Sequence, residues 1–439
     1  MIYQDCQTAG TYREGVSTNS ISDLKRKTKT TINSLNRENP NIIIFIIYGI
    51  LYETVINIYK PFAVKFLQRV GGNDFHIALY NSLPGLVAML VLLPGVLLLS
   101  KLKTKRNATS MFFLASRFFF LLIAAIPFLP PELQPLAFVV LVALMNFPEA
   151  LAQTSLQGFL GSVFDSRLRA SAISLRNKFG SVVLMIIPLV TGMIITFVPK
   201  TDTQAILWYQ IFFVIAFLIG LVEIFVFRKF KEREAFEPVS TNFKSVSIVL
   251  KDKKFTKFLS TAIAYQFAWQ AGWPLCAIYH IRVLDASEIW FALFSTSGAF
   301  VAICTAGFWV KFIRKHGNNT AILLAIFTSA LTTLLFPFTT SLWIMFFITA
   351  FSGFATFGSN TTLLNGLLQN TKDENRLIYI GTYNTFVNMS LFLSPLAASL
   401  LLTTYGIQHS LLIIFAFRSC AGIFMYLAYR NEHIDAKPN

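Results

Sequence analysis

The sequence predicts an all-α membrane protein with twelve transmembrane helices in two pseudo-symmetric six-helix bundles. Three observations support this fold class. First, 55% of the 439 residues are hydrophobic, only 13% are charged, and the mean hydropathy is +0.60, whereas a soluble domain carries about twice that fraction of charge. The other two are a series of twelve apolar segments and an internal repeat that divides the chain in half.

The apolar segments have the length expected of membrane-crossing helices, about 20 residues each. Lipid offers no hydrogen bonds to a polypeptide backbone, so each segment should be helical, and the alternating pattern of a membrane β-barrel is missing. Short connections imply that consecutive helices run antiparallel. The expected helices span residues 41–68, 75–100, 107–128, 134–158, 171–198, 205–228, 256–282, 286–313, 319–338, 342–369, 377–403 and 409–429.

Residues of the first half recur in the second half roughly 210 positions later. The offset drifts slowly in one direction, which favours a duplicated half over chance matches. A period this long excludes a solenoid, and about six segments per copy indicate a duplicated membrane bundle. The matched pairs include Tyr52 with Tyr265, Glu53 with Gln266, Asn57 with Gln270, Pro61 with Pro274, Arg69 with Arg282 and Asp165 with Asp373.

The same pattern predicts the domain organisation. We expect a disordered cytoplasmic tail at 1–40, a first bundle at 41–228, a cytoplasmic linker at 229–255, a second bundle at 256–430 and a C-terminal tail at 431–439. The first forty residues contain no apolar core of a cleavable signal peptide.

The net charge of +16 is distributed unevenly between the two ends of the predicted helices. Most Lys and Arg residues lie in the tail and in the connections at one end, and Lys65, Arg69, Lys200 and Arg282 are the only ones at the other. This is the positive-inside bias, so we expect a cell-membrane protein with both termini in the cytoplasm. The basic residues are therefore interpreted as topology signals, with contact to anionic lipid secondary, and not as a nucleic-acid site.

Polar residues follow single faces of several expected helices. Glu53 and Asn57 share a face of the first, and Gln266 and Gln270 occupy the matching positions of the seventh. The fourth carries Asn146, Glu149, Gln153 and Gln157, and the tenth carries a looser stripe that includes Asn360. Hydrogen bonds between helices would explain such stripes; we favour a shared aqueous cavity between helices 1, 4, 7 and 10. The predicted substrate-binding residues are Glu53, Asn57, Gln153, Gln266, Trp269, Gln270 and Asn360.

Buried charges give the second set of expectations. Glu53 lies about 18 Å from the cytoplasmic end of its helix, where a carboxylate can exchange protons or form a permanent ion pair, for example with Lys60. Glu149 and Arg117 lie at matching depths on neighbouring helices, which predicts a salt bridge; the alternative is a substrate or proton site on Glu149 gated by Arg117. Glu223 is expected to reach the lipid headgroups.

Other residues allow two interpretations each. Trp269 and its aromatic neighbours would stack on a flat or cationic ligand or simply pack. Pro61 and Pro274 would act as hinges or only curve their helices. Arg418 has no obvious acidic partner in the sequence.

The chain resembles the major facilitator superfamily over about residues 41–430. The turn from Asp165 to Arg169 is similar to an acidic-then-arginine turn of that family, and Asp373 to Arg376 is its counterpart in the second half. The resemblance implies that these residues clamp helix ends. The family's glycine–aspartate–basic motif is incomplete, because no aspartate follows Gly95 and Lys311 replaces the acid after Gly307. The drug-antiporter motifs are also missing.

The resemblance implies a secondary transporter that works by alternating access. Together with the polar stripes it predicts a small polar or amphiphilic solute as substrate, with Glu53 and Glu149 as candidates for proton coupling. The alternatives are lipid or lysolipid transport, or a transport-like sensor without flux. Motifs of membrane enzymes are missing, and we expect no cofactor, no metal and a monomer whose partners are the solute, the bilayer and protons.

Overall fold

The computed structural model describes residues 39–100, 105–164, 166–231, 249–372 and 376–429. The chain divides into two compact units, Met1–Ile43 and Ile44–Asn439, and the helices described below belong to the second, apart from the first residues of α2. The described residues are almost entirely helical and contain no strand.

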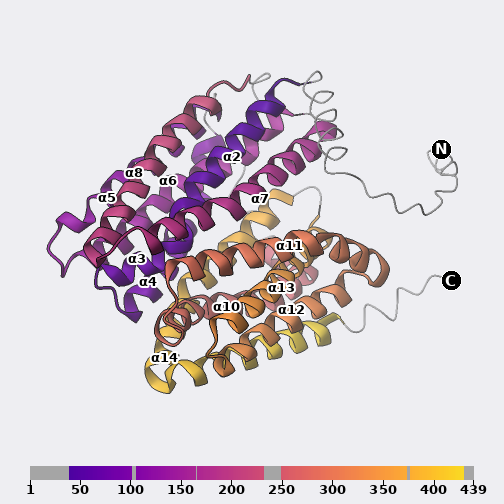
Figure 1. Cartoon of the computed structure of the whole chain (residues 1–439). Coiled ribbons are helices and arrows are strands. Elements are labelled where there is room, and N and C mark those ends of the chain that lie inside the picture. The colour runs from indigo at the N-terminus through magenta and orange to yellow at the C-terminus, as the bar shows by residue number, and fades with distance from the viewer. Residues whose placement is uncertain (1–38, 101–104, 165, 232–248, 373–375, 430–439) are drawn as a thin grey trace, which may run out of the picture. The chain divides into compact units, whose positions relative to one another are not determined.

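Helices of the first half run side by side (Figure 1). Thr201 caps the helix that follows it, because its side chain accepts a hydrogen bond from the backbone N–H of Gln204. The elements are α2 (Asn41–Tyr59), η1 (Lys60–Phe62), α3 (Ala63–Arg69), α4 (Asp74–Ser100), α5 (Lys105–Ala124), η2 (Ile126–Phe128), α6 (Gln134–Val163), α7 (Ser166–Phe197) and α8 (Asp202–Phe227).

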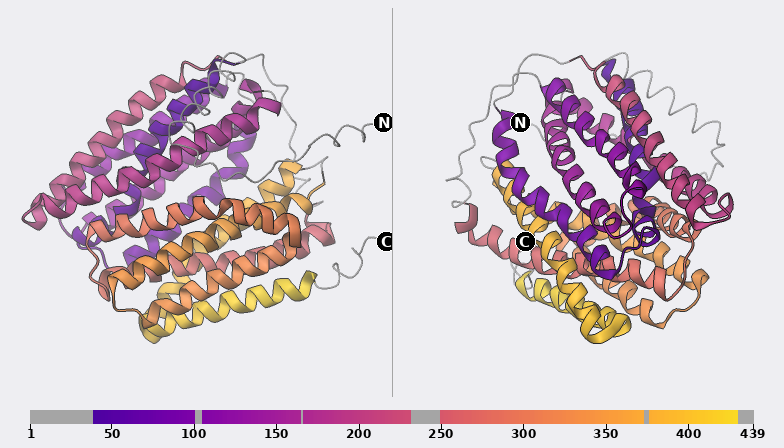
Figure 2. Two further views of the ribbon diagram at one scale, coloured as in Figure 1. Left: turned by 45° about the vertical axis from the view of Figure 1, so that its right-hand side comes forward. Right: turned by 90° about the vertical axis from the view of Figure 1, so that its left-hand side faces the viewer.

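Helices of the second half also run side by side (Figures 1 and 2). Asp252 caps the first of them by accepting bonds from the N–H groups of Lys254 and Phe255. The last helix contains Gly406 at φ 75°, a conformation that favours glycine, so two helical segments meet there without a longer loop. The elements are α10 (Lys253–Arg282), α11 (Glu288–His316), α12 (Asn318–Leu335), η3 (Phe336–Phe338), α13 (Leu342–Gln369) and α14 (Arg376–Tyr429).

Ten helical stretches of the described residues are long and apolar enough to cross a membrane. One of them, Ile378–Ala428, covers two expected helices that meet at Gly406. Helix α10 is not among the ten; its Gln266 and Gln270 make it more polar than its neighbours. A multi-pass, all-helical membrane protein is thus confirmed, while the number twelve stays a prediction.

The two halves contact each other along two helix pairs, α4 with α14 and α7 with α11. The Ser82 hydroxyl donates to the carbonyl of Phe392 in the first pair. In the second, Thr296 donates to the carbonyl of Met185 at 3.2 Å. Small polar side chains that bond to backbone allow close helix packing inside a membrane.

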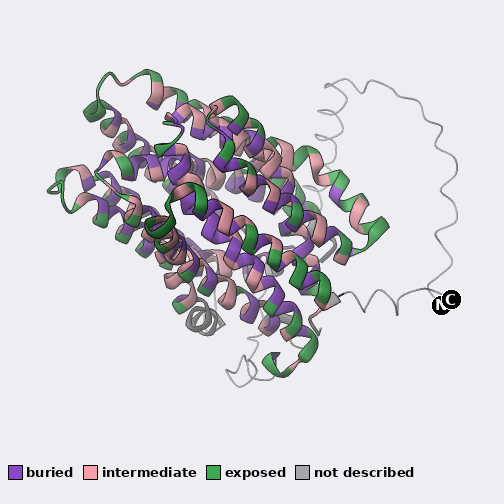
Figure 3. Ribbon diagram, turned by 90° about the horizontal axis from the view of Figure 1, so that it is seen from below, coloured by how far each residue is buried: buried purple, intermediate pink, exposed green. Residues whose placement is uncertain are grey.

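Aromatic side chains fill much of the interior. Phe66 lies 5.1–5.2 Å, centroid to centroid, from Phe138, Tyr209 and Phe213, and Phe66, Phe120 and Phe138 are fully buried. Figure 3 shows buried and exposed residues alternating around the helices. The charged residues described first in the next subsection lie on α2, α5, α6, α7 and α8.

Candidate functional site

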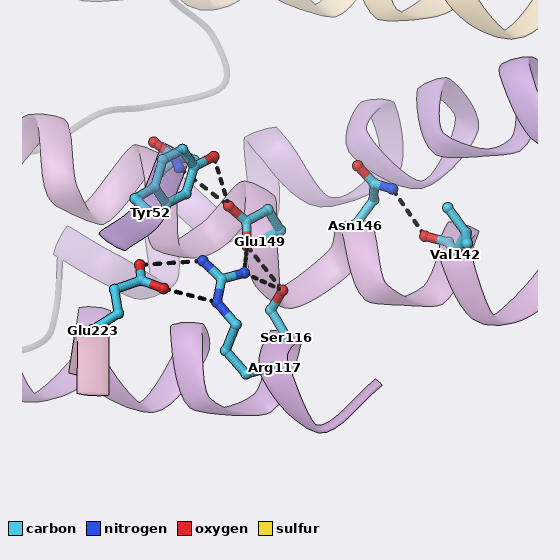
Figure 4. Close-up of polar contacts among 8 residues, drawn as sticks. Tyr52, Ser116, Arg117, Val142, Asn146, Glu149 and Glu223 are labelled. Atoms are coloured by element: carbon cyan, nitrogen blue, oxygen red, sulfur yellow. Dashed lines mark hydrogen bonds and ion pairs between the residues drawn. The ribbon is translucent and has the colours of Figure 1, made fainter. Parts of the chain in front are cut away.

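Arg117 of α5 lies between two carboxylates from different helices (Figure 4). Its Nε and Nη2 donate to the two oxygens of Glu223 on α8, at 3.0 and 3.2 Å. Its Nη1 donates to Oε2 of Glu149 on α6 at 3.0 Å. The ion pair predicted between Arg117 and Glu149 is therefore present, and the bidentate bond to Glu223 adds a fixed orientation.

Glu149 accepts three further hydrogen bonds. The Tyr52 hydroxyl on α2 donates to Oε1 at 3.1 Å, and the Gln153 amide one turn along α6 donates to the same oxygen at 3.1 Å. The Ser116 hydroxyl donates to Oε2 at 2.8 Å. Of the polar face predicted on the fourth helix, Gln153 contacts this carboxylate, and the side chain of Gln157 lies outside the described residues. Asn146, by contrast, bonds back to the carbonyl of Val142 (Figure 4).

The expectation for Glu223 was wrong. Its side chain is fully buried and bonded to Arg117, and does not reach headgroups. Position near a helix end predicts depth but not the direction in which a side chain points around the helix. Here α5 packs against α8, and Arg117 supplies the compensating charge that a buried carboxylate requires.

Glu53 pairs with Arg176 of α7, whose Nη2 lies 3.0 Å from Oε1. The Asn57 amide donates to Oε2 of Glu53 at 3.3 Å, so the two residues predicted on one face are joined. A Cβ at Gly49 would lie 2.4 Å from Arg176, and a Cβ at Gly180 would lie 3.0 Å from Glu53. The two glycines leave room for the pair. Lys60, the partner considered from the sequence, is exposed.

Tyr52 links the two ion-pair groups. The guanidinium carbons of Arg117 and Arg176 lie 5.6 and 5.5 Å from the centroid of its ring, within cation–π range. We call the set Tyr52, Glu53, Arg117, Glu149, Arg176 and Glu223 the charge cluster. It contains three carboxylates and two guanidinium groups, so it carries one excess negative charge when every group is ionised.

In the second half, the matched glutamines face α14. The Gln266 amide lies 3.5 Å from the Tyr383 hydroxyl, and the Gln270 amide lies 3.5 Å from the carbonyl of Val387. Both side chains are buried, and both Oε1 atoms have no hydrogen-bond partner among the described residues. Buried polar atoms without a partner are uncommon in folded proteins, so the two glutamines, one helical turn apart, mark a candidate polar site.

Trp269 contacts Trp273, with the ring centroids 5.1 Å apart and the rings nearly perpendicular. Its backbone carbonyl accepts a bond from Nη2 of Arg418 at 2.9 Å. Arg418 also donates to the carbonyls of Ala268 and Ser329. A partner for this arginine is thus found in backbone oxygens rather than in an acid.

A groove of about 360 Å³ lies between α11 and α13. The two helices approach closely at Gly298 and Gly353. Asn360 is exposed one turn beyond Thr356, which lines the groove. Within the described residues, no hydrogen bond or ion pair joins Asn360 or the two glutamines to the charge cluster. The lining hydroxyls are Ser295, Thr349, Ser352 and Thr356.

The two halves also carry ion pairs at the ends of α3, α4, α10 and α11. Arg69 donates to Oε1 of Glu288 at 2.7 Å and also pairs with Asp202. The Glu288 side chain is only 2% exposed. Arg282 pairs with Asp74 at 2.9 Å, but is itself 59% exposed. The Arg69–Glu288 and Arg282–Asp74 pairs connect the first half to the second at the end where α3 and α10 terminate.

The predicted structural residues are only partly described. Asp165 and Asp373 lie outside the described residues, as does the side chain of Arg376 at the start of α14. Arg169 donates to the carbonyl of Phe164 at 3.2 Å. The clamps implied by the resemblance therefore stay predictions.

The matched prolines lie in different local structures. Pro61 is in η1, where its missing N–H interrupts the helix between α2 and α3, and Pro274 lies inside the continuous α10. Whether either acts as a hinge stays a prediction.

Sequence reasoning missed Arg176, Glu288 and the inward position of Glu223. Arg176 was given no role from the sequence, although it lies several residues inside the expected helix 171–198, and that depth was the available signal. The described residues contain no group of three or more His, Cys, Asp or Glu side chains suited to hold a metal ion.

A family model described as the Major Facilitator Superfamily matches residues 42–395 and, in a second match, 258–439. The overlapping second match agrees with a repeated half. A search of the curated proteins gives no match.

Several solved transporter structures share the fold. The nucleoside transporter NupG has a TM-score of 0.70 at 10% identity, covering 88% of this chain and 99% of that chain. A POT family transporter in complex with 5-aminolevulinic acid has a TM-score of 0.70 at 9% identity, covering 90% and 96%. A bacterial homologue of the human lysosomal transporter Spinster, inward-facing and unoccupied, has 0.64 at 14%, covering 90% and 97%.

Proposed function

The chain belongs to the major facilitator superfamily and is a membrane transporter, and we propose that it moves a small polar or amphiphilic solute by proton-coupled alternating access. The observation that carries the coupling is the charge cluster, which pairs three carboxylates with two guanidinium groups. A net charge inside a membrane is costly, so binding of one proton would stabilise the cluster. Release of that proton would restore the net negative charge and so favour a rearrangement of the helices that carry the cluster.

We place the exchangeable proton on Glu53. Its side chain is 18% exposed, whereas that of Glu223 is fully buried and bonded through both oxygens. Glu53 has fewer bonds than Glu149, which accepts from four side chains. Protonation would weaken its pair with Arg176 of α7, and α7 packs against α11 of the second half. Proton binding at Glu53 is thereby coupled to the contact between the halves.

Alternating access also requires an end that closes. The ion pairs of Arg69 with Glu288 and of Arg282 with Asp74 cross between the halves at one end. With the termini in the cytoplasm of a cell-membrane protein, as the distribution of basic residues favours, this end faces outward. The described arrangement then corresponds to a state closed toward the outside.

Most of the proposed substrate contacts are in the second half. Gln266 and Gln270 offer two unpaired acceptors, and the groove between α11 and α13 offers hydroxyls within about 360 Å³. Such groups suit a small solute with hydrogen-bond donors. Predicted contacts through Asn57, Gln153, Trp269 and Asn360 remain part of the proposal.

The test begins with a thermal-shift screen of the detergent-solubilised chain. Nucleosides, a thioalcohol-conjugated peptide and 5-aminolevulinic acid serve as the first probes, because the similar solved structures are a nucleoside transporter and POT family transporters in complex with the other two. A ligand that binds only the folded protein raises its stability by RT ln(1 + [L]/Kd). A stabilisation that is lost in a Gln266→Ala, Gln270→Ala double variant would support the site; an undiminished one would contradict it.

Flux of the identified solute into liposomes then tests coupling. An imposed pH gradient should drive accumulation by the wild type, and Glu53→Gln should abolish that accumulation while solute exchange continues. Glu132→Gln is the matched control, since Glu132 is exposed between η2 and α6. Gradient-driven accumulation by the Glu53→Gln variant would refute the proton site, and exchange alone in the wild type would refute coupling.

A further inference from the structure

A cavity outside the charge cluster lies where α5 begins and α8 ends. Its volume is about 460 Å³, and it is lined by Arg106, Asn107, Met111, Leu114 and Arg228. Asn107, Met111 and Leu114 follow one another at steps of four and three residues, so they form one face of α5. The cavity thus combines two guanidinium groups and an amide at the helix ends with apolar side chains farther into the membrane span.

The two arginines have no carboxylate partner among the described residues, and one of them is held by a backbone carbonyl. Arg106 donates through Nη1 to the carbonyl of Phe230 at 2.8 Å, and its Nε is buried without a hydrogen-bond partner. Arg228 follows the last residue of α8 and is exposed. In the described part of the chain, neither arginine forms an ion pair with a carboxylate. An anion with several acceptor oxygens would satisfy both guanidinium groups.

The apolar part of the cavity opens on exposed hydrophobic surface. Met111 is 68% exposed, Phe118 two turns farther along α5 is 50% exposed, and Phe225 on α8 is 63% exposed. Phe118 contacts Phe217 of α8, so the two helices form a continuous apolar track below the arginines. The Nζ atom of Lys229, the residue after Arg228, lies 4.5 Å from the centroid of the Phe225 ring and adds a third cation at this end of α8.

We propose that this cavity binds an anionic phospholipid, with the phosphate between Arg106 and Arg228 and an acyl chain along Met111 and Leu114. A free phosphate would use only the cationic end, and a zwitterionic lipid such as phosphatidylcholine would bring a quaternary ammonium beside its phosphate, which offsets the attraction to the two guanidinium groups. The position of the cavity at a helix end matches the headgroup level of a bilayer. The site does not depend on which solute is transported.

Native mass spectrometry of the purified full-length protein tests the proposal with equal amounts of phosphatidylglycerol and phosphatidylcholine. We expect phosphatidylglycerol to be retained preferentially. Arg228→Gln should weaken its binding about fivefold, the effect of one basic group near an anionic lipid. Arg106→Gln should act in the same way. Leu114→Trp should fill the apolar part of this cavity and weaken lipid binding without changing its charge.

Arg314→Gln is the matched control, because Arg314 is exposed near the end of α11 and does not line the cavity. Its binding of phosphatidylglycerol should equal that of the wild type. Glycerol phosphate, which has the headgroup chemistry without acyl chains, should not displace the lipid. Equal retention of the two lipids, an equal loss in Arg314→Gln and Arg228→Gln, no loss in Leu114→Trp, or displacement by glycerol phosphate would each overturn the proposal.

Discussion

Arg117 and Arg418 are both buried inside a half of the molecule, but their charges are compensated in different ways. Arg117 in the first half bonds to the carboxylates of Glu149 and Glu223. Arg418 in the second half bonds to three backbone carbonyls and to the hydroxyls of Ser329 and Thr333, with no ion-pair partner among the described residues. One environment is made of full charges and the other of dipoles.

The difference indicates a division of labour between the duplicated halves. Carboxylates can gain or lose a proton, so the first half can change its charge. Carbonyls and hydroxyls cannot do so near neutral pH, and Arg418 instead ties α14 to α10 and α12. The close approach is visible at Gly272, where a Cβ would lie 2.4 Å from Nη2 of Arg418. We interpret Arg418 as a structural residue and the charge cluster as the functional one.

Arg117→Met should give the largest loss of stability. It leaves two carboxylates without their cation, and breaking a buried pair costs about 3–5 kcal/mol. The apparent melting temperature in detergent measures this loss. A triple variant with Glu149→Gln and Glu223→Gln should regain much of it, because no uncompensated charge then remains. If the single and triple variants melt together, the charge interpretation of this cluster is wrong.

Arg418→Met should cost less, about 1.5–3 kcal/mol, the range for hydrogen bonds to a charged group. No ionised partner is left behind, and the carbonyls can keep their helical bonds. The same melting experiment measures it, with Arg418→Lys as the companion variant that keeps the charge but not the planar donor arrangement. A loss as large as that of Arg117→Met would remove the contrast between the two arginines.

Thr333→Asp tests whether the dipole environment accepts a full charge. The Thr333 hydroxyl bonds to Nη1 of Arg418, so an aspartate there should be tolerated better with Arg418 present than in Arg418→Met. We expect a coupling of about 1 kcal/mol in the double-mutant cycle of melting stabilities. Additive effects of the two substitutions would mean that the new carboxylate does not reach the arginine.

Arg282→Gln should have the smallest effect, below about 1 kcal/mol, because exposed ion pairs contribute little. Arg282 is 59% exposed in its pair with Asp74. Melting at low and high salt provides the check, and the small difference from the wild type should shrink as salt screens the pair. If Arg282→Gln lost as much stability as Arg418→Met, the exposure of an ion pair would not determine how much it contributes to stability.

Most of the fold could be predicted from the sequence, and part of the site. Apolar segments and the repeat located the helices to within several residues, because crossing a bilayer fixes both length and backbone structure. The Arg117–Glu149 pair was predictable since consecutive antiparallel helices place equal depths side by side. The pairs of Glu53 with Arg176 and of Arg117 with Glu223 join helices that are not consecutive, and neither depth nor periodicity indicates which distant helices pack together.

The position of Arg117 also has a consequence for biogenesis. Ribosomal synthesis delivers α5 before α6 and well before α8, so the arginine reaches the insertion machinery before Glu149 and Glu223 do. A lone arginine near the middle of a span is poorly inserted. The first half should therefore leave the insertion machinery as a group of helices and not one at a time, with the arrival of α8 adding the second carboxylate partner of Arg117.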